Sequence, residues 1–161
     1  MKLRIVPVFL PHGGCKGRCI YCNQHVVLGA GLDTPDEAAI SDAISKAESA
    51  GTKDSGELEI AFFGSSFTAL PQAEQNTYLE IGSRLLKCGR ISGIRVSTHP
   101  SHVDEETLSR LAGYGVGTVE LGIQSFSDMV LSAAKRSHTA IEAADACRRV
   151  QAAGMQLVIQ L

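Results

Sequence analysis

Blocks of hydrophobic residues with two different periods alternate along the chain. Short apolar or period-two blocks are typical of strands, and they are separated by blocks in which apolar residues recur every three or four positions, as in amphipathic helices. This β–α alternation predicts an α/β fold with a parallel sheet and right-handed crossovers. The predicted strands are Arg4–Leu10, Leu58–Phe63, Gly93–His99, Thr118–Gln124 and Met155–Leu161.

Capping residues set the limits of the predicted helices. Thr34 is expected as the N-cap of the first helix, with Pro35 at its first position and Glu37 closing a capping box, and Gly51 ends it. Further helices are expected over 71–88, from Asp104 to Gly113 or Gly115, after Ser127, and from a Thr139–Glu142 capping box to Gly154. Cys88 and Cys147 fall within these helical patterns and are interpreted as buried thiols.

The last three predicted strands are apolar on one face and polar on the other. Successive side chains of a strand point to opposite faces, so the apolar row can pack under helices. The opposite row needs hydrogen-bond partners, and we expect a polar ligand in a barrel lumen to supply them. An open sheet with one solvated face is the alternative. The polar row consists of Arg95, Ser97, His99, Glu120, Gln124, Gln156 and Gln160.

Composition excludes several classes of protein. The chain has 161 residues, 44% of them hydrophobic, and a net charge of −2, which gives no general attraction to nucleic acid. No apolar run approaches the roughly 20 residues of a membrane span. Five cysteines, three of them clustered, argue against a disulfide framework and for a reducing, cytoplasmic setting.

The clustered cysteines are Cys15, Cys19 and Cys22, in a C-x3-C-x2-C arrangement. Thiolates select iron–sulfur clusters, zinc or copper(I), and a closed site uses four protein ligands where this motif offers three. Two readings follow from spacing alone. One is a four-iron cluster with an open iron, and the other is a zinc site completed by His12 or His25.

The motif and its surroundings resemble a known family. Tyr21 stands before the last cysteine, and segments 5–24, 61–71 and 94–139 are similar, in the same order, to the radical S-adenosylmethionine (SAM) superfamily. Within it they resemble the bacterial Elongator-protein-3-like group, close to the oxygen-independent coproporphyrinogen III oxidases. The resemblance implies an α/β fold, a partial TIM-like (βα) barrel truncated at the C-terminus, of which about five parallel strands are present. Residues 1–161 are then expected to be an incomplete radical SAM core domain.

The resemblance also implies cofactors and site residues. A [4Fe-4S] cluster on Cys15, Cys19 and Cys22 is expected to cleave SAM reductively, and the 5′-deoxyadenosyl radical so formed takes hydrogen from an unknown substrate. Ser65 stands where the relatives typically have glycine. The expected SAM contacts are Tyr21 beside the adenine, Gly64, Ser65 and Ser66 at the amino group, Arg136 at the carboxylate, and Ser97 and Gln124 on strands.

The implied partners are a one-electron donor such as flavodoxin or ferredoxin and a substrate that is either tRNA or a small molecule, with no membrane. Two alternatives remain: a non-catalytic zinc-binding interaction module, or an inactive fragment of a radical SAM enzyme. The predicted last strand, Met155–Leu161, is apolar and has no helix after it. We therefore expect an exposed strand edge through which the chain self-associates.

Overall fold

A computed structural model describes residues 3–11, 19–22, 34–51, 56–64 and 66–161. Five strands in these ranges form one parallel sheet in the order β1-β2-β3-β4-β5. Sequential order in a parallel sheet means that each crossover leads to the neighbouring strand, as in a (βα) barrel segment. The predicted α/β fold and its five parallel strands are confirmed. The strands are β1 (Leu3–Phe9), β2 (Glu57–Phe63), β3 (Gly93–Thr98), β4 (Val116–Gly122) and β5 (Gln156–Gln160).

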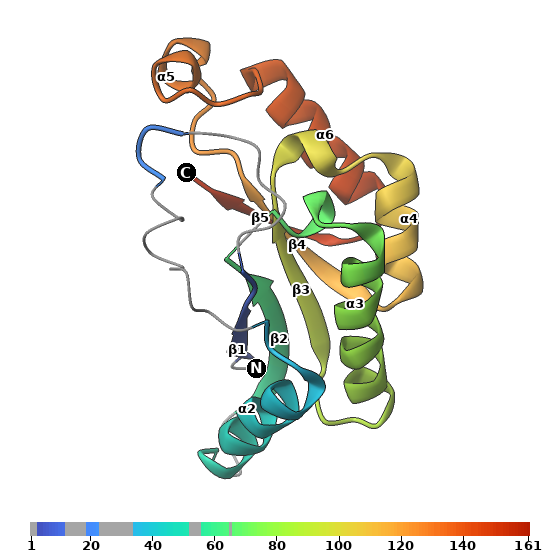
Figure 1. The fold of residues 1–161 in the computed structure, drawn as a ribbon. Helices are drawn as coiled ribbons and strands as arrows, with labels where there is room; N and C mark the ends of the chain where they lie inside the picture. The colour runs from blue at the N-terminus through green and yellow to red at the C-terminus, as the bar shows by residue number, and fades with distance from the viewer. Residues whose placement is uncertain (1–2, 12–18, 23–33, 52–55, 65) are drawn as a thin grey trace.

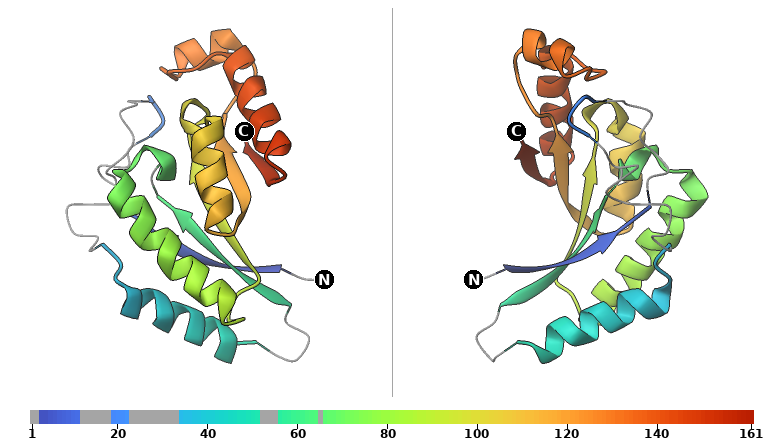
Figure 2. Two further views of the ribbon diagram at one scale, coloured as in Figure 1. Left: turned by 90° about the vertical axis from the view of Figure 1, so that its right-hand side faces the viewer. Right: turned by 60° about the vertical axis from the view of Figure 1, so that its left-hand side comes forward.

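The long helices cover one face of the curved sheet (Figures 1 and 2). Their apolar sides and the strand residues that face the helices form one core, with Phe62, Ile60, Ile94, Leu121 and Leu79 almost fully buried. The other face of the sheet is open at β1, where Ile5 and Phe9 are exposed. The helices are α2 (Glu37–Ser49), α3 (Gln72–Lys87), α4 (Glu105–Gly113), α5 (Asp128–Ala133) and α6 (Ala140–Ala152), with short 3₁₀ turns η1 (Phe67–Ala69) and η2 (Pro100–His102).

The predicted helix starts are confirmed except that of α2. Asp104 caps α4, and Thr139 with Glu142 forms the predicted capping box of α6. The start of α2 was wrong: the N-cap is Asp36, whose carboxylate accepts the Ala39 N–H at 2.8 Å, so Thr34 and Pro35 precede the helix. Ser127 holds the N-cap position of α5, but its side chain makes no capping hydrogen bond.

Strand β4 begins and ends two residues earlier than predicted. The register between β3 and β4 shifts by one residue: Ile94 pairs with Val116 and Arg95 with Thr118, which leaves Gly117 as an extra residue. At the other end Gln124 lies beyond the strand, in left-handed backbone with φ of 71°. The prediction that Gln124 is a strand residue was therefore wrong.

The polar row on the open face is largely satisfied by the protein itself. Arg95, buried in β3, donates to Glu59 of β2 at 2.8 Å and lies 3.4 Å from Glu120 of β4. Thr118 donates to the second oxygen of Glu59 at 2.8 Å. The expectation that a bound ligand must pair with Arg95 and Glu120 was wrong, because the sequence pattern did not show that Glu59 faces them.

The two helical thiols also differ from the prediction. Cys88 is exposed at the C-cap of α3, and Cys147 is only half-buried on α6. The sequence analysis interpreted both thiols as buried. Cys88 is exposed because it lies at the end of α3, beyond the part of the helix that packs on the core. In the described ranges, no helix combines the length and the hydropathy that a membrane span requires.

Candidate functional site

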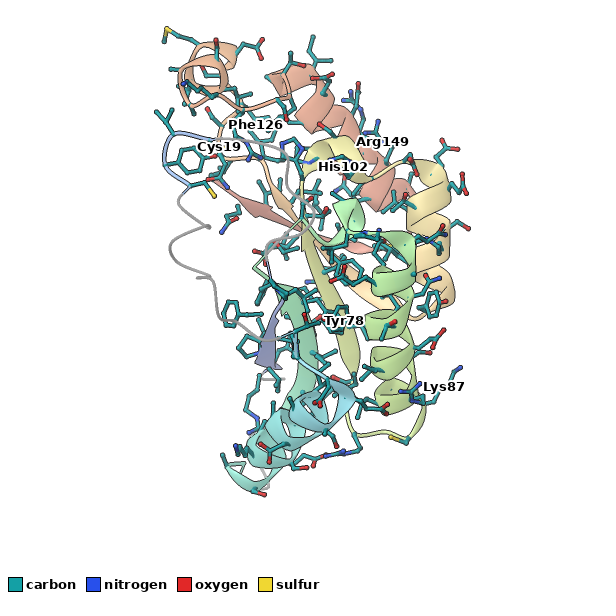
Figure 3. The ribbon with its side chains drawn as sticks, viewed as in Figure 1. Cys19, Tyr78, Lys87, His102, Phe126 and Arg149 are labelled. Carbon is teal, nitrogen blue, oxygen red and sulfur yellow. The ribbon has the colours of Figure 1, made fainter. Side chains whose placement is uncertain are left out.

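The predicted site residues gather where the parallel strands end. Carboxyl ends of parallel strands meet at one edge of the sheet, and ligand sites of (βα) barrels are built there. The loop with Cys19 follows β1, Gly64 and Ser66 follow β2, Gln124 follows β4, and Arg136 follows α5. Figure 3 shows Cys19, Phe126 and His102 at this end of the molecule.

Cys19 and Cys22 lie on a tight turn. The Cys22 N–H donates to the carbonyl of Cys19 at 3.0 Å, and the Ile20 N–H donates to the carbonyl of Ala134 at 3.2 Å. The turn is thus attached to the segment that follows α5. Cys19 is buried and Cys22 half-buried. Cys15 lies outside the described residues, and within them no group of three or more potential metal ligands is assembled.

Arg136 reaches from the segment after α5 to this turn. Its Nη1 donates to Sγ of Cys19 at 3.4 Å, and its Nη2 donates to the carbonyl of Gly122 at the end of β4. Its buried Nε has no hydrogen-bond partner in the described part of the chain. A buried guanidinium N–H without an acceptor is unusual, and a carboxylate is the acceptor that a guanidinium binds best.

Tyr21 lies beside Cys19 and Arg136, although about half of it is exposed. Burial raises the pKa of Tyr21, Arg136 acts in the opposite direction, and Cys19 and Cys22 raise it further. The aromatic ring therefore stands at the rim of the turn, next to Cys19 and Arg136.

Gly64 and Ser66 lie in close contact with neighbouring backbone. Gly64 has φ of 94°, and a Cβ placed there would stand 2.7 Å from the carbonyl oxygen of Leu10. Only glycine fits a position that is left-handed and this close to another chain segment. The Ser66 hydroxyl accepts the His99 N–H at 3.1 Å and lies 3.0 Å from the Thr98 hydroxyl. Ser65 lies outside the described residues.

The remaining predicted contacts are less closely grouped. Ser97 is half-buried in β3, in register with Glu120. The Gln124 side chain lies 3.4 Å from that of Gln160, at the ends of β4 and β5. Within the described residues, neither side chain is hydrogen-bonded to Cys19, Arg136 or Ser66.

Two histidines at this end of the sheet have no site role in the sequence analysis, which placed His99 only in the polar row. His99 and His138 are both buried, and Nε2 of His99 lies 3.2 Å from Nδ1 of His138. Burial lowers the pKa of His99 to about 3, with smaller contributions from Arg136, His138 and His102. Burial and Arg136 also lower the pKa of His138. For His138 the one available signal was its place two residues after Arg136. The two histidines are 39 positions apart in the sequence, and no local pattern shows that they are in contact.

The donor chemistry fits an iron–sulfur cluster with SAM beside it. Two thiol sulfurs on one turn are suitable cluster ligands, and the guanidinium beside Cys19 supplies a positive charge that complements thiolates. The buried Arg136 Nε provides a donor for a carboxylate at the same place. Cys19, Cys22 and Tyr21 would border the cluster, and Arg136 would face the carboxylate of SAM.

The chain belongs to the radical SAM superfamily, whose profile matches residues 9–161. Its curated relatives include a tRNA-2-methylthio-N(6)-dimethylallyladenosine synthase of Alkalilimnicola ehrlichii, 30% identical over 87% of this chain and 32% of the relative. The heme chaperone HemW of Lactococcus lactis is 25% identical over 88% of this chain and 36% of the relative. The chain thus spans about one third of the length of these relatives.

Solved structures with low sequence identity share the fold. The archaeal Methanocaldococcus infernus Elp3 superposes with a TM-score of 0.74 at 15% identity, covering 98% of this chain and 37% of that one. TsrM of Kitasatospora setae, solved with cobalamin and a [4Fe-4S] cluster bound, gives a TM-score of 0.64 at 19% identity over 96% of this chain and 28% of that one.

These matches confirm the predictions made at the level of the family. The family is that of radical SAM enzymes, and its cofactors are a [4Fe-4S] cluster and SAM. The partial (βα) barrel predicted from the resemblance is confirmed by the likeness to Elp3.

Proposed function

We propose that this chain is the catalytic N-terminal part of a radical SAM enzyme, with Cys15, Cys19 and Cys22 as the ligands of a [4Fe-4S] cluster. The observation that carries the proposal is the contact of Arg136 with Cys19. It joins the motif of the three cysteines to a guanidinium whose buried Nε–H has no acceptor among the described residues. When bound, the cluster and SAM supply reductive cleavage of SAM and a radical that takes hydrogen from the substrate.

The chain's own residues bind and orient SAM in this proposal. Arg136 binds the carboxylate, because a fixed guanidinium offers charge and direction together. Backbone at Gly64, Ser65 and Ser66 approaches the amino group, and Tyr21 covers the adenine. Ser97 and Gln124 are proposed as further contacts on β3 and after β4.

The substrate and the partners are proposals as well. An electron donor such as flavodoxin or ferredoxin would dock near the cysteine turn. The relatives that modify tRNA favour an RNA substrate, whereas the net charge of −2 favours a small molecule. Residues 1–161 would form part of the radical SAM core domain. In the relatives, the elements that determine substrate specificity would lie in the part of their length that this chain does not cover.

The competing function is a zinc-stabilised interaction module that does no chemistry. It would use the same cysteines with a fourth protein ligand, since structural zinc sites are closed. The two functions differ in the metal they hold, in the presence of sulfide and in the response to SAM.

Metal analysis of anaerobically reconstituted protein tests the proposal. We expect about four irons and matching acid-labile sulfide per chain, and loss of the cluster when Cys15, Cys19 or Cys22 is replaced by alanine. Cys88→Ala and Cys147→Ala are the controls and should keep the iron, because these thiols lie on the helical face of the sheet. One zinc per chain without sulfide, or equal iron loss in Cys88→Ala, would reject the assignment.

A further inference from the structure

Arg136 stands in a short segment, 134–139, that joins α5 to α6. The segment leaves α5 through a left-handed residue, Lys135 with φ of 55°, and the Arg136 N–H returns to the carbonyl of Leu131 at 2.9 Å. Lys135, Ser137 and Thr139 are exposed, whereas only 4% of His138 is exposed. His138 is therefore the fully buried side chain by which this segment is anchored to the rest of the fold.

The partner of His138 is His99, which connects to the glycine-rich segment after β2. The His99 ring meets the His138 ring edge-on, with centroids 4.8 Å apart. The backbone N–H of His99 donates to the hydroxyl of Ser66 at 3.1 Å. A continuous path thus runs from Ser66 through His99 to His138, and so to the segment that carries Arg136.

The hydrogen bonds determine where the protons of both rings lie. The Ser101 N–H donates to Nδ1 of His99 at 3.1 Å, so this nitrogen carries no proton. The proton of the neutral ring is then on Nε2, which donates to Nδ1 of His138. His138 in turn carries its proton on Nε2. This buried nitrogen makes no hydrogen bond of normal geometry in the described residues, although the Ile123 backbone raises the pKa of the ring.

A protonated pair would not fit this arrangement. A proton added at Nδ1 of His99 would oppose the Ser101 N–H, and one added at Nδ1 of His138 would oppose the Nε2–H of His99. Burial and the positive charge of Arg136 act in the same direction, since they lower the pKa of both rings. The Nε2 of His99 also lies 3.5 Å from the hydroxyl of Ser137, a second contact with the same segment.

We propose that His99 and His138 are positioning residues for SAM: their hydrogen bond fixes the Arg136 segment relative to Ser66, so that the carboxylate and amino contacts of SAM stand ready in one geometry. The inference rests on the proposed function. Binding groups held in place before the ligand arrives lose less free energy on binding. Neither histidine touches SAM in this account, and both act through the segments they join.

The test compares two replacements of His138 in the reconstituted protein. His138→Phe keeps a ring but removes both nitrogens, whereas His138→Asn keeps an acceptor for the His99 Nε2–H. We expect His138→Phe to weaken SAM binding about three- to tenfold, the range of one neutral hydrogen bond, with iron content unchanged. We expect His138→Asn to stay within about twofold of the unsubstituted protein. The exposed His102→Phe is the matched control and should leave SAM affinity unchanged.

Two measurements without SAM separate positioning from general stability. Amide hydrogen exchange over 134–139 should speed up in His138→Phe and not in His138→Asn. Nitrogen NMR of the unsubstituted protein should show both rings protonated at Nε2, and a His99 ring protonated at Nδ1 would overturn the inference. Should the phenylalanine variant not fold, His138→Ala replaces it with the same expected results.

The outcomes distinguish this inference from the proposed function. If the unsubstituted protein binds no SAM, the proposed function falls. If it binds SAM and a folded His138→Phe binds it equally well, or if His138→Asn loses as much affinity as His138→Phe, the positioning role alone is wrong. The double variant of His138→Phe with His99→Phe should lose no more SAM affinity than the single variant that binds SAM more weakly. Both changes remove the same hydrogen bond between His99 and His138.

Discussion

At the scale of single residues, backbone geometry makes Gly64 irreplaceable. An alanine there would be left-handed, and its Cβ would stand 2.7 Å from the Leu10 carbonyl oxygen. We expect Gly64→Ala to lower the free energy of unfolding by at least about 1–2 kcal/mol. Gly113→Ala is the control, because no atom lies within 4 Å of the added methyl group and alanine favours the helix by up to about 1 kcal/mol. Chemical denaturation of the two variants measures the difference, and equal stability would contradict it.

Sequence reasoning at this scale succeeded where the signal is local. The capping box of Thr139 and Glu142 uses residues three apart, and it is present as predicted. The cap of α2 failed because Thr34 and Asp36 can both cap a helix, and only the folded backbone selects between them. The pairing of His99 with His138 could not be predicted, since no local pattern encodes a contact between segments so far apart.

At the scale of elements, three strands are joined by the ion pairs of Arg95. Periodicity predicted five strands, with β4 displaced by two residues, and it predicted the face of Arg95 correctly. It could not predict the partner Glu59, which depends on the register between β2 and β3. The one-residue shift at Gly117 likewise has no signal in the sequence, and it brings Thr118 to the same carboxylate. The register between two strands depends on how their side chains pack, and the sequence of one strand alone does not specify it.

Removing Arg95 should be costly because it leaves Glu59 as a buried charge without its partner. We expect Arg95→Met to lower the free energy of unfolding by about 3–5 kcal/mol, and the double variant Arg95→Met with Glu59→Leu to recover much of that loss. The exposed pair Lys46–Asp42 is the control, and Lys46→Met should leave the free energy of unfolding nearly unchanged. Urea denaturation gives all three values. A double variant less stable than Arg95→Met would show that the ion pairs do more than satisfy each other.

At the scale of the whole molecule, the five-stranded sheet has two edges and an open face. β1 and β5 each pair with one neighbour in the described sheet. Apolar side chains are exposed near both edges: Ile5 and Phe9 on β1, and Ile159 with Leu161 at the end of β5. Parallel strands are usually covered on both faces and paired on both sides. The polar network of Arg95 covers the middle of the open face, so the unpartnered apolar surface lies toward the edges.

We therefore expect the 161-residue chain, taken as a separate polypeptide, to self-associate by pairing at a strand edge. Size-exclusion chromatography with light scattering should show a concentration-dependent increase in mass. Ile159→Lys places a charge at the β5 edge and should shift the chain toward monomer, because charged edge residues block strand pairing. Ile141→Lys adds the same charge at an exposed position of α6, and it should leave the association unchanged. A monodisperse monomer at high concentration would mean that the edges do not pair, and an equal effect of both lysines would assign the association to net charge rather than to the β5 edge.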